Sequence, residues 1–355
     1  MEVKEIKTIE EFENCFKDIV YLWDKCEEKE IFYSPQFLKQ YLRSFKDENI
    51  LYLLMYHNNR PSLLAPLKIV TRKISFFNWK ELKFGLEGDF KNFILDNSLN
   101  NEDTLLKNIF KYIEKLDVDR ISLDNILPKT SLSKYILKNQ KYSFSFYHQN
   151  MVPELDFREY ENFKEFEKNF PANTRKYKNK LLREVDVKFE IVDDITEEFY
   201  DEIKKVHIAE KNYLKQAGRT KRYSIYEDRK REDFIKNIQL NSKSVRVFIL
   251  RDLQTGKIIV YRNCYISDDK LISWNTAYDP KYSKYSLSNG IFYFMFKELF
   301  KNNLHDKFNF GVGGYAWKFG YATGFDNIFI LDYFKSEKGK RISKLINIKK
   351  ALEDN

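Results

Sequence analysis

The chain has 355 residues, of which 43% are hydrophobic, enough to build two packed domains of ordinary size. Its three cysteines lie far apart and form no CxxC motif, which argues against a zinc site or a disulfide framework. The net charge of +9 would suit a nucleic acid, a nucleotide cofactor or a membrane face without choosing among them. The N-terminal stretch is charged and no long apolar run follows, so we expect no signal peptide, no integral membrane segment and a cytoplasmic location.

The first 150 residues alternate between helical and strand patterns. Ser34 followed by Pro35 is a typical helix start, because an N-cap residue precedes a proline at the first helical position. Apolar runs on both sides of residues 57–60 predict a hairpin. This alternation predicts an α/β or α+β domain with a mostly buried sheet. The predicted helices are 9–27, 35–45, 101–116 and 130–139, and the predicted strands are 50–56, 62–70, a pair within 73–96, and 119–123.

The second half shows a comparable order of elements without any close sequence repeat. Its strongest helix is 197–216, where Phe199, Ile203, Val206 and Leu214 share one face and His207 lies beside them. We therefore expect two domains, 1–150 and 151–355. The remaining predicted helices are 161–169, 173–184, 229–240 and 288–302, and the predicted strands are 151–155, 187–192, 245–250, 258–266, 271–278 and 307–310.

A glycine-rich stretch follows the last of these strands. Residues 309–320 read NFGVGGYAWKFG, and they hold four of the chain's eleven glycines. Such glycines let a backbone adopt positive φ angles or approach a ligand closely. Lys318 lies between two aromatic residues there, where it could meet an anionic group or stabilise a developing oxyanion. The alternative is a turn that ends in a surface lysine.

Several motifs of the second half form a recognisable series. They are Ala277-Tyr-Asp-Pro280, then Tyr285-Ser286 with Gly290 before an apolar helix, then Asn309-Phe-Gly-Val-Gly313 and Trp317-Lys318. This series resembles the CelD-like acetyltransferases, a branch of the GNAT superfamily allied to the Fem-type peptidyl transferases. The resemblance spans about residues 30–325. It implies tandem GNAT-like domains, each a mixed, largely antiparallel sheet flanked by helices, and an N-acyltransferase that uses acyl-CoA and no metal.

The resemblance also implies roles for individual residues. In GNAT folds the pyrophosphate of acyl-CoA lies at a helix N-terminus, whose first amides lack partners and sit at the positive end of the helix dipole. The acyl group would pass from the thioester to a small-molecule amine or amino-sugar acceptor by direct attack in a ternary complex. The implied cofactor-binding residues are Ser286, Ser288, Asn289 and Gly290, the catalytic candidates are Lys318, Tyr285 and Asp279, and the substrate-binding candidates are Trp317, Tyr315, Asp89 and Arg175.

Two departures keep other functions open. Asn309 stands where the CelD-like family has Asp, and Val312 stands where it has Arg. A degenerate scaffold that binds a partner without catalysis would explain both. A Fem-like aminoacyl-tRNA-dependent peptidyl transferase acting on a cell-envelope precursor would instead use the positive charge and the basic helix near 174–183 to hold tRNA.

Overall fold

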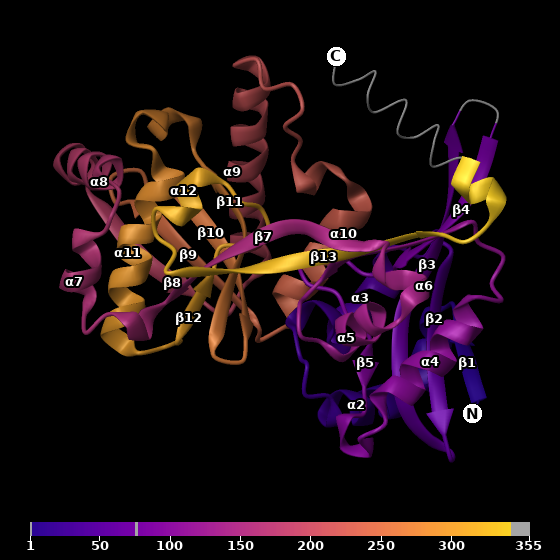
Figure 1. Ribbon diagram of the computed structural model, residues 1–355. Coiled ribbons are helices and arrows are strands. Elements are labelled where there is room, and N and C mark those ends of the chain that lie inside the picture. The colour runs from indigo at the N-terminus through magenta and orange to yellow at the C-terminus, as the bar shows by residue number, and fades with distance from the viewer. Residues whose placement is uncertain (1, 75–76, 342–355) are drawn as a thin grey trace. The chain divides into compact units, whose positions relative to one another are not determined.

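The chain folds into two compact units. The computed structural model describes residues 2–74 and 77–341 (Figure 1). The first unit comprises the chain up to Asn150 and again from Asn327 onward, and the second comprises Met151–Asp326. Strand β7 (Phe146–Asp156) carries the chain into the second unit, and β13 (Gly324–Phe334) carries it back. The functional domains 1–150 and 151–355 stay a prediction, and residues 342–355 lie outside the described part.

The first unit is a mixed sheet with helices packed on it. Its hairpin turns at Asn58 and Asn59, whose φ angles of 51° and 60° are the left-handed values that a tight two-residue turn requires. Ser34 caps the third helix by accepting a hydrogen bond from Phe37 N–H, as its sequence predicts. The strand order is β1 (Glu2–Ile6), β2 (Ile50–His57), β3 (Arg60–Ile74), β4 (Phe77–Phe84), β6 (Arg120–Ile126) and β13, with β5 (Ile94–Leu95) beside β3.

The helices of this unit lie close to their predicted ranges. They are α1 (Ile9–Asn14), α2 (Phe16–Lys25), α3 (Pro35–Ser44), α4 (Glu102–Ile113), α5 (Ser131–Lys138) and α6 (Gln140–Ser143), with 3₁₀ turns at Ile31–Tyr33 and Asn97–Leu99. Within 73–96, where a strand pair was expected, the structure has the end of β3 and β4, which pair in antiparallel fashion, and the short β5, which pairs with β3.

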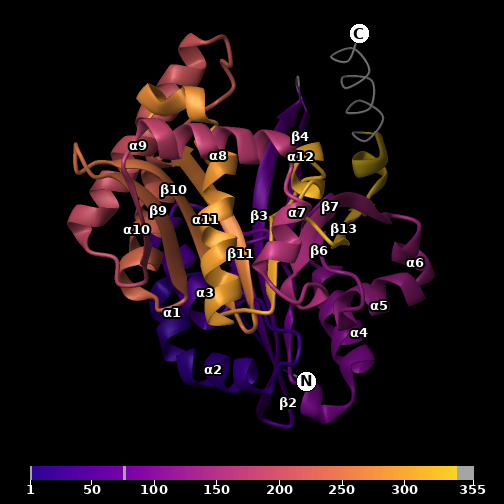
Figure 2. The ribbon, with the colours of Figure 1, turned by 90° about the vertical axis from the view of Figure 1, so that its left-hand side faces the viewer.

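The second unit is a sheet covered on both faces. Helices α7 (Phe163–Lys168), α8 (Ala172–Glu184) and α11 (Leu287–Asn302) lie on one face, and α9 (Glu197–Gln216) and α10 (Arg229–Asn241) lie on the other (Figures 1 and 2). This mixed sheet between helices confirms the predicted fold class. The strand order is β7, β12 (Lys307–Asn309), β11 (Lys270–Tyr278), β10 (Ile258–Ser267), β9 (Val245–Asp252) and β8 (Val187–Val192).

Aromatic side chains fill the space between α11 and the sheet. Phe292 and Phe296 stack on one another with ring centroids 5.2 Å apart, and Phe308 of β12 meets Phe296 edge-on at 5.1 Å. Short elements complete the unit, namely α12 (Ala316–Phe319) and 3₁₀ turns at Phe157–Glu159, Ile225–Glu227 and Pro280–Tyr285. Among residues 2–74 and 77–341, no helix combines the length and the apolar character needed to cross a bilayer.

The buried face of α9 differs from the predicted one. Tyr200, Ile203, His207 and Glu210 are buried, whereas Phe199, Val206 and Leu214 are only half-buried. The true stripe therefore passes through His207 instead of beside it. Burial lowers the pKa of His207 to about 3, and its Nδ1 lies 2.8 Å from the Ser224 hydroxyl oxygen. Hydrophobic spacing could not reveal this face, because two of its four members are polar.

This burial predicts an acid sensitivity that His207→Gln should remove. Since the pKa of His207 is lower in the folded state than in the unfolded state, the unfolded chain takes up a proton between about pH 6.5 and pH 3 that the folded chain does not. The free energy of unfolding should fall by roughly 2 kcal/mol from this group between pH 7 and pH 5. Urea titrations at both pH values check it, and equal pH slopes in the variant and the native chain would contradict it.

Candidate functional site

Strands β11 and β12 separate within the second unit. They pair in parallel over three positions only, and the pairing ends where Ile272 meets Asn309. A β-bulge at Trp274 follows, since Asn275 pairs with Asn263 and Ser273 pairs with Cys264. From Ser273 to Tyr278, β11 therefore has a described ladder partner only on its β10 side. The opposite edge presents peptide groups that an extended amide-bearing ligand can pair with.

The helix that follows β11 begins with an uncapped N-terminus. Its N-cap, Ser286, has left-handed angles of φ 50° and ψ 48° and makes no side-chain capping hydrogen bond. Hydrogen bonds within the protein begin with the N–H groups of Asn289 and Gly290, which donate to the Ser286 carbonyl at 3.2 and 3.0 Å. The amides of Leu287 and Ser288 precede them, at the positive end of the helix dipole. A left-handed non-glycine residue costs about 1 kcal/mol, and such strain is common at ligand sites.

The described residues around position 290 do not require a glycine there. A Cβ placed on it would meet nothing nearer than the Tyr285 carbonyl oxygen at 3.9 Å, and its φ is not positive. Glycine inside a helix costs about 1 kcal/mol relative to alanine. Neither packing nor backbone geometry therefore requires this glycine, whereas a ligand lying against the first turn of α11 would.

Arg262 brings a positive charge beside this helix start. It is 4% exposed, and its guanidinium lies 4.1 Å from the centroid of the Phe292 ring. Nη1 donates to the Ser273 hydroxyl at 2.7 Å and Nη2 donates to the Ser288 carbonyl at 2.8 Å, so that one side chain joins β10, β11 and the first turn of α11.

The charge of Arg262 has no counter-ion among the residues that the structure describes. Burial lowers the pKa of Arg262 to about 10, which keeps it charged at neutral pH. No described carboxylate contributes to this pKa or forms an ion pair with the guanidinium, and its Nε–H has no acceptor among the described residues. A buried cation next to the positive end of a helix is unfavourable alone. A bound anion at the helix start would relieve this repulsion.

The glycine-rich stretch is a turn tied together by Lys318. Gly311 and Gly313 have φ angles of 74° and 115°, so two of the glycines are needed for left-handed backbone. Lys318 is buried, and its ammonium donates to the carbonyls of Gly311 at 2.7 Å and Val312 at 2.9 Å. Asn309 accepts from Gly311 N–H at 2.9 Å. That acceptor role needs only an oxygen, which the family's Asp would also supply.

The other predicted catalytic residues have partners of their own. The Tyr285 hydroxyl donates to Glu184 of α8 at 2.9 Å, and this contact places the 3₁₀ turn Pro280–Tyr285 against α8. Asp279 caps that turn by accepting from Lys281 N–H at 3.0 Å. Their catalytic roles stay predictions.

The predicted substrate-binding residues lie in different elements. Trp317 stacks on Phe292 of α11 at 5.9 Å, which places α12 next to the first turns of that helix, and Tyr315 is exposed. Arg175 is exposed on α8. Asp89 lies between β4 and β5 in the first unit. The second unit therefore brings Trp317 and the four predicted cofactor-binding residues to one region around the start of α11.

Glu210 is a candidate that the sequence did not reveal. It is one of two buried carboxylates described in the second unit, and the other, Asp252, accepts hydrogen bonds from Tyr282 and Gln254. Glu210 forms an ion pair with Lys211. Burial raises the pKa of Tyr278, the last residue of β11, and the negative charge of Glu210 raises it further. Glu210 therefore faces the strand that has the free edge.

A group of uncharged side chains lies on the same face of the sheet. We call it the neutral cluster, and it consists of Tyr226, Gln239, Tyr261, Asn263 and Asn275. Its hydroxyl and carboxamide oxygens and nitrogens are buried, and none closes a hydrogen bond with another described residue. Each unsatisfied buried polar group costs about 1–3 kcal/mol. Over five side chains this cost would approach the roughly 5–15 kcal/mol that stabilises a whole domain, which makes the neutral cluster a candidate contact site for water or a ligand.

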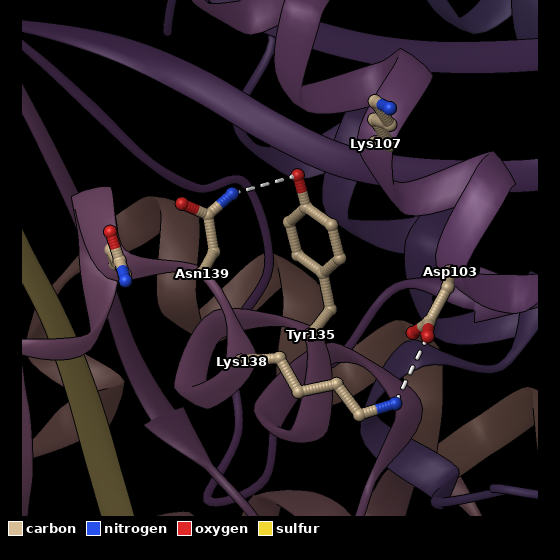
Figure 3. Close-up of a pocket in the computed structure, with 6 residues that line it drawn as sticks. Asp103, Lys107, Tyr135, Lys138 and Asn139 are labelled. Atoms are coloured by element: carbon tan, nitrogen blue, oxygen red, sulfur yellow. Dashed lines mark hydrogen bonds and ion pairs between the residues drawn. The ribbon is translucent and has the colours of Figure 1, made fainter.

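The first unit contains a separate open hollow. It has a volume of about 480 Å³ and lies between α4 and α5 (Figure 3). Four of its polar side chains form two pairs, since Lys138 forms an ion pair with Asp103 at 3.0 Å and Asn139 donates to the Tyr135 hydroxyl at 3.3 Å. Because these side chains bind one another, they give no sign of a ligand site.

The position of Lys318 predicts that it stabilises the second unit. Lys318→Met removes two charge-assisted hydrogen bonds from a buried turn, so the free energy of unfolding should fall by about 3 kcal/mol. Lys301→Met is a matched control, because Lys301 is exposed on α11 and its ion pair contributes little. Denaturant unfolding of both variants measures this, and equal stabilities would contradict the structural role.

Part of the second unit matches a known domain family. Residues 168–319 match the family described as Acetyltransferase (GNAT) domain. L-PGS from Bacillus licheniformis has a similar fold, with a TM-score of 0.57 and 13% identity over 90% of this chain and 92% of that one. FemX superposes with a TM-score of 0.58 and 11% identity over 98% and 100% of the two chains.

A further similar structure is the C-terminal domain of a putative lysylphosphatidylglycerol synthetase from Agrobacterium fabrum, with a TM-score of 0.57 and 11% identity over 94% and 96% of the chains. Among curated proteins the sequence finds no match. At these identities the structural likeness shows the fold, while the family match shows the domain. The segment 168–319, which carries the separating strands and the uncapped helix, is a GNAT acetyltransferase domain, and the protein is an acyltransferase.

Proposed function

We propose that the protein is an acyl-CoA-dependent N-acyltransferase of the CelD-like type, acting in the cytoplasm. It moves an acyl group from the thioester to an amine acceptor by direct attack in a ternary complex. The observation that carries this proposal is the free edge of β11 from Ser273 to Tyr278, directly followed by the uncapped start of α11. An extended donor with amides at one end and phosphates at the other fits these two features in that order.

The donor would bind in two parts. The pantetheine amides would pair with the free edge of β11 as an added strand does. The pyrophosphate would accept hydrogen bonds from the amides of Leu287 and Ser288, where the helix dipole and the uncompensated charge of Arg262 both favour an anion. Arg262 acts here as a positioning residue, since its hydrogen bonds to Ser273 and Ser288 fix the first turn of α11 against β11.

The transfer itself needs a deprotonated amine and a stabilised oxyanion. The amine nitrogen attacks the thioester carbonyl, the C–N bond forms, the C–S bond breaks, and coenzyme A leaves as a thiolate that takes up a proton. We assign Glu210 as the base that accepts the amine proton, because it is buried on α9 and faces β11. Lys318 fixes the turn after β12 through the Gly311 and Val312 carbonyls, and its predicted action on the oxyanion would be exerted from there.

A Fem-like reaction, with aminoacyl-tRNA as donor, is the second candidate. The fold similarity to FemX and the exposed Arg175 and Lys176 on α8 favour it. The two donors are separated by direct binding measurements with acetyl-CoA and with a charged tRNA at several salt concentrations. Tight acetyl-CoA binding without a tRNA complex supports the first proposal, and the reverse result supports the second.

Gly290→Ala tests the donor site. The added methyl group should raise the free energy of unfolding by about 1 kcal/mol, because alanine replaces a helical glycine and its Cβ would make only an ordinary contact, with the Tyr285 carbonyl oxygen at 3.9 Å. It should weaken acetyl-CoA binding about tenfold or more, since the phosphates lose their approach to the first turn. Gly324→Ala is the control, because a Cβ there meets nothing within 4 Å and Gly324 lies outside the proposed donor site. Calorimetric titration of both variants decides, and unchanged donor affinity in Gly290→Ala would refute the site.

Glu210→Gln tests the base. Turnover should fall about a hundredfold or more, the usual scale for the loss of a general base, with donor affinity unchanged. Glu198→Gln, an exposed change on the first turn of the same helix, should leave turnover at the native level. Steady-state rates and acetyl-CoA titrations of both variants provide the comparison. A native turnover number in Glu210→Gln would remove Glu210 from the mechanism.

A further inference from the structure

The neutral cluster has a defined place in the second unit. Asn263 of β10 and Asn275 of β11 are register partners, so they share the face that α9 and α10 cover. Tyr261 lies two residues before Asn263 on the same face, at 6.4 Å from the His207 ring. Asn275 belongs to the stretch of β11 that has the free edge, and it is half-buried while the other four members are buried. A ligand that reaches β11 therefore meets Asn275 first.

The members of the cluster lie within reach of one another. Burial raises the pKa of Tyr226 to about 12, and hydrogen-bond contacts with Tyr261, Asn275 and Gln239 oppose this rise. Their oxygens and nitrogens nonetheless lack partners of hydrogen-bonding geometry among the described residues. The side chains thus lie close together, and their polar atoms make no well-formed hydrogen bond among the described residues.

The chemistry of the cluster limits what it can recognise. Two hydroxyls and three carboxamides supply both donors and acceptors and carry no charge. The adjacent His207 is also neutral at pH 7, and the nearby Glu210 is already paired with Lys211. A carboxylate or a polyamine would be buried here without an opposite charge. An apolar amine would leave the cluster unsatisfied. Hydroxyl groups, which both donate and accept, match it.

We propose that the neutral cluster binds the hydroxyl groups of a sugar ring, so that the acceptor of the acyl group is an amino sugar. This inference rests on the proposed N-acyltransfer, and it assigns the acceptor side of that reaction. The sugar ring would lie on the α9 face of β10 and β11, with its amine toward β11. The cluster would then discriminate among amines by their hydroxyl groups, because an analogue without them leaves buried polar atoms unpaired.

The test compares two amines on a six-membered ring, glucosamine and cyclohexylamine, of which only the first carries hydroxyl groups. Calorimetric titration of the full chain, with and without acetyl-CoA, should show glucosamine binding about tenfold or more tightly than cyclohexylamine. Asn263→Leu and Tyr261→Phe should each abolish this preference and leave acetyl-CoA affinity unchanged. Their melting temperatures should be equal to or above the native value, since each removes polar atoms that no residue satisfies.

Tyr142→Phe is the matched control, because the buried Tyr142 hydroxyl donates to Glu114 in the first unit. It should lower the melting temperature and leave the glucosamine preference unchanged. Equal affinities for the two amines, or a preference that survives both cluster variants, would overturn the sugar site. So would a fall in the melting temperature of Tyr261→Phe to that of Tyr142→Phe, since it would show a cluster closed by water or by its own side chains.

The two proposals fail in different ways. Acetyl-CoA binding without a preference for glucosamine would refute the sugar site and leave the acyltransfer proposal intact. A preference for glucosamine in a chain that does not bind acetyl-CoA would refute the proposed donor and support the cluster as a sugar site.

Discussion

The early end of the pairing between β11 and β12 is the constraint on which the second unit depends. Three paired positions hold these strands together, and the β-bulge at Trp274 then redirects β11. An edge left open inside a sheet is normally a liability, because its peptide groups seek partners. Here α11 starts just beyond that edge, and the aromatic core beneath the helix fixes its direction. The opening is thus built into a rigid region, and a mobile loop is not needed to create it.

Local sequence signals predicted most elements of this fold. Helix α9 occupies its predicted range, Ser34 and Pro35 begin α3, and the asparagine pair turns the hairpin. Strand β13, by which the chain returns to the first unit, was not predicted. Its pairing with β6, about two hundred residues earlier, leaves no local sequence pattern. The predicted buried face of α9 differs by one residue from the observed face for a related reason. Its histidine and glutamate are buried by tertiary packing, which hydropathy does not encode.

The parts of the candidate site that depend on backbone conformation could be predicted from the sequence. The family resemblance led to Ser286 and Gly290, and the glycines themselves to the turn after β12; the structure has a helix N-terminus at the first place and left-handed glycines at the second, while their binding roles stay predictions. The side chains with the most unusual environments were not found. Arg262, Glu210 and the neutral cluster are ordinary residues in ordinary strands and helices, and only their burial sets them apart. Lys318 was noticed for its aromatic neighbours, yet its firmest contacts are two carbonyls of its own turn.

The burial of Arg262 has a consequence for how the enzyme responds to acidity. Even with its pKa lowered to about 10, the guanidinium keeps its proton across the physiological range. The attraction of Arg262 for an anion at the start of α11 is therefore the same in mild acid and in mild base. A change of donor affinity with pH inside this range must therefore come from a group other than Arg262.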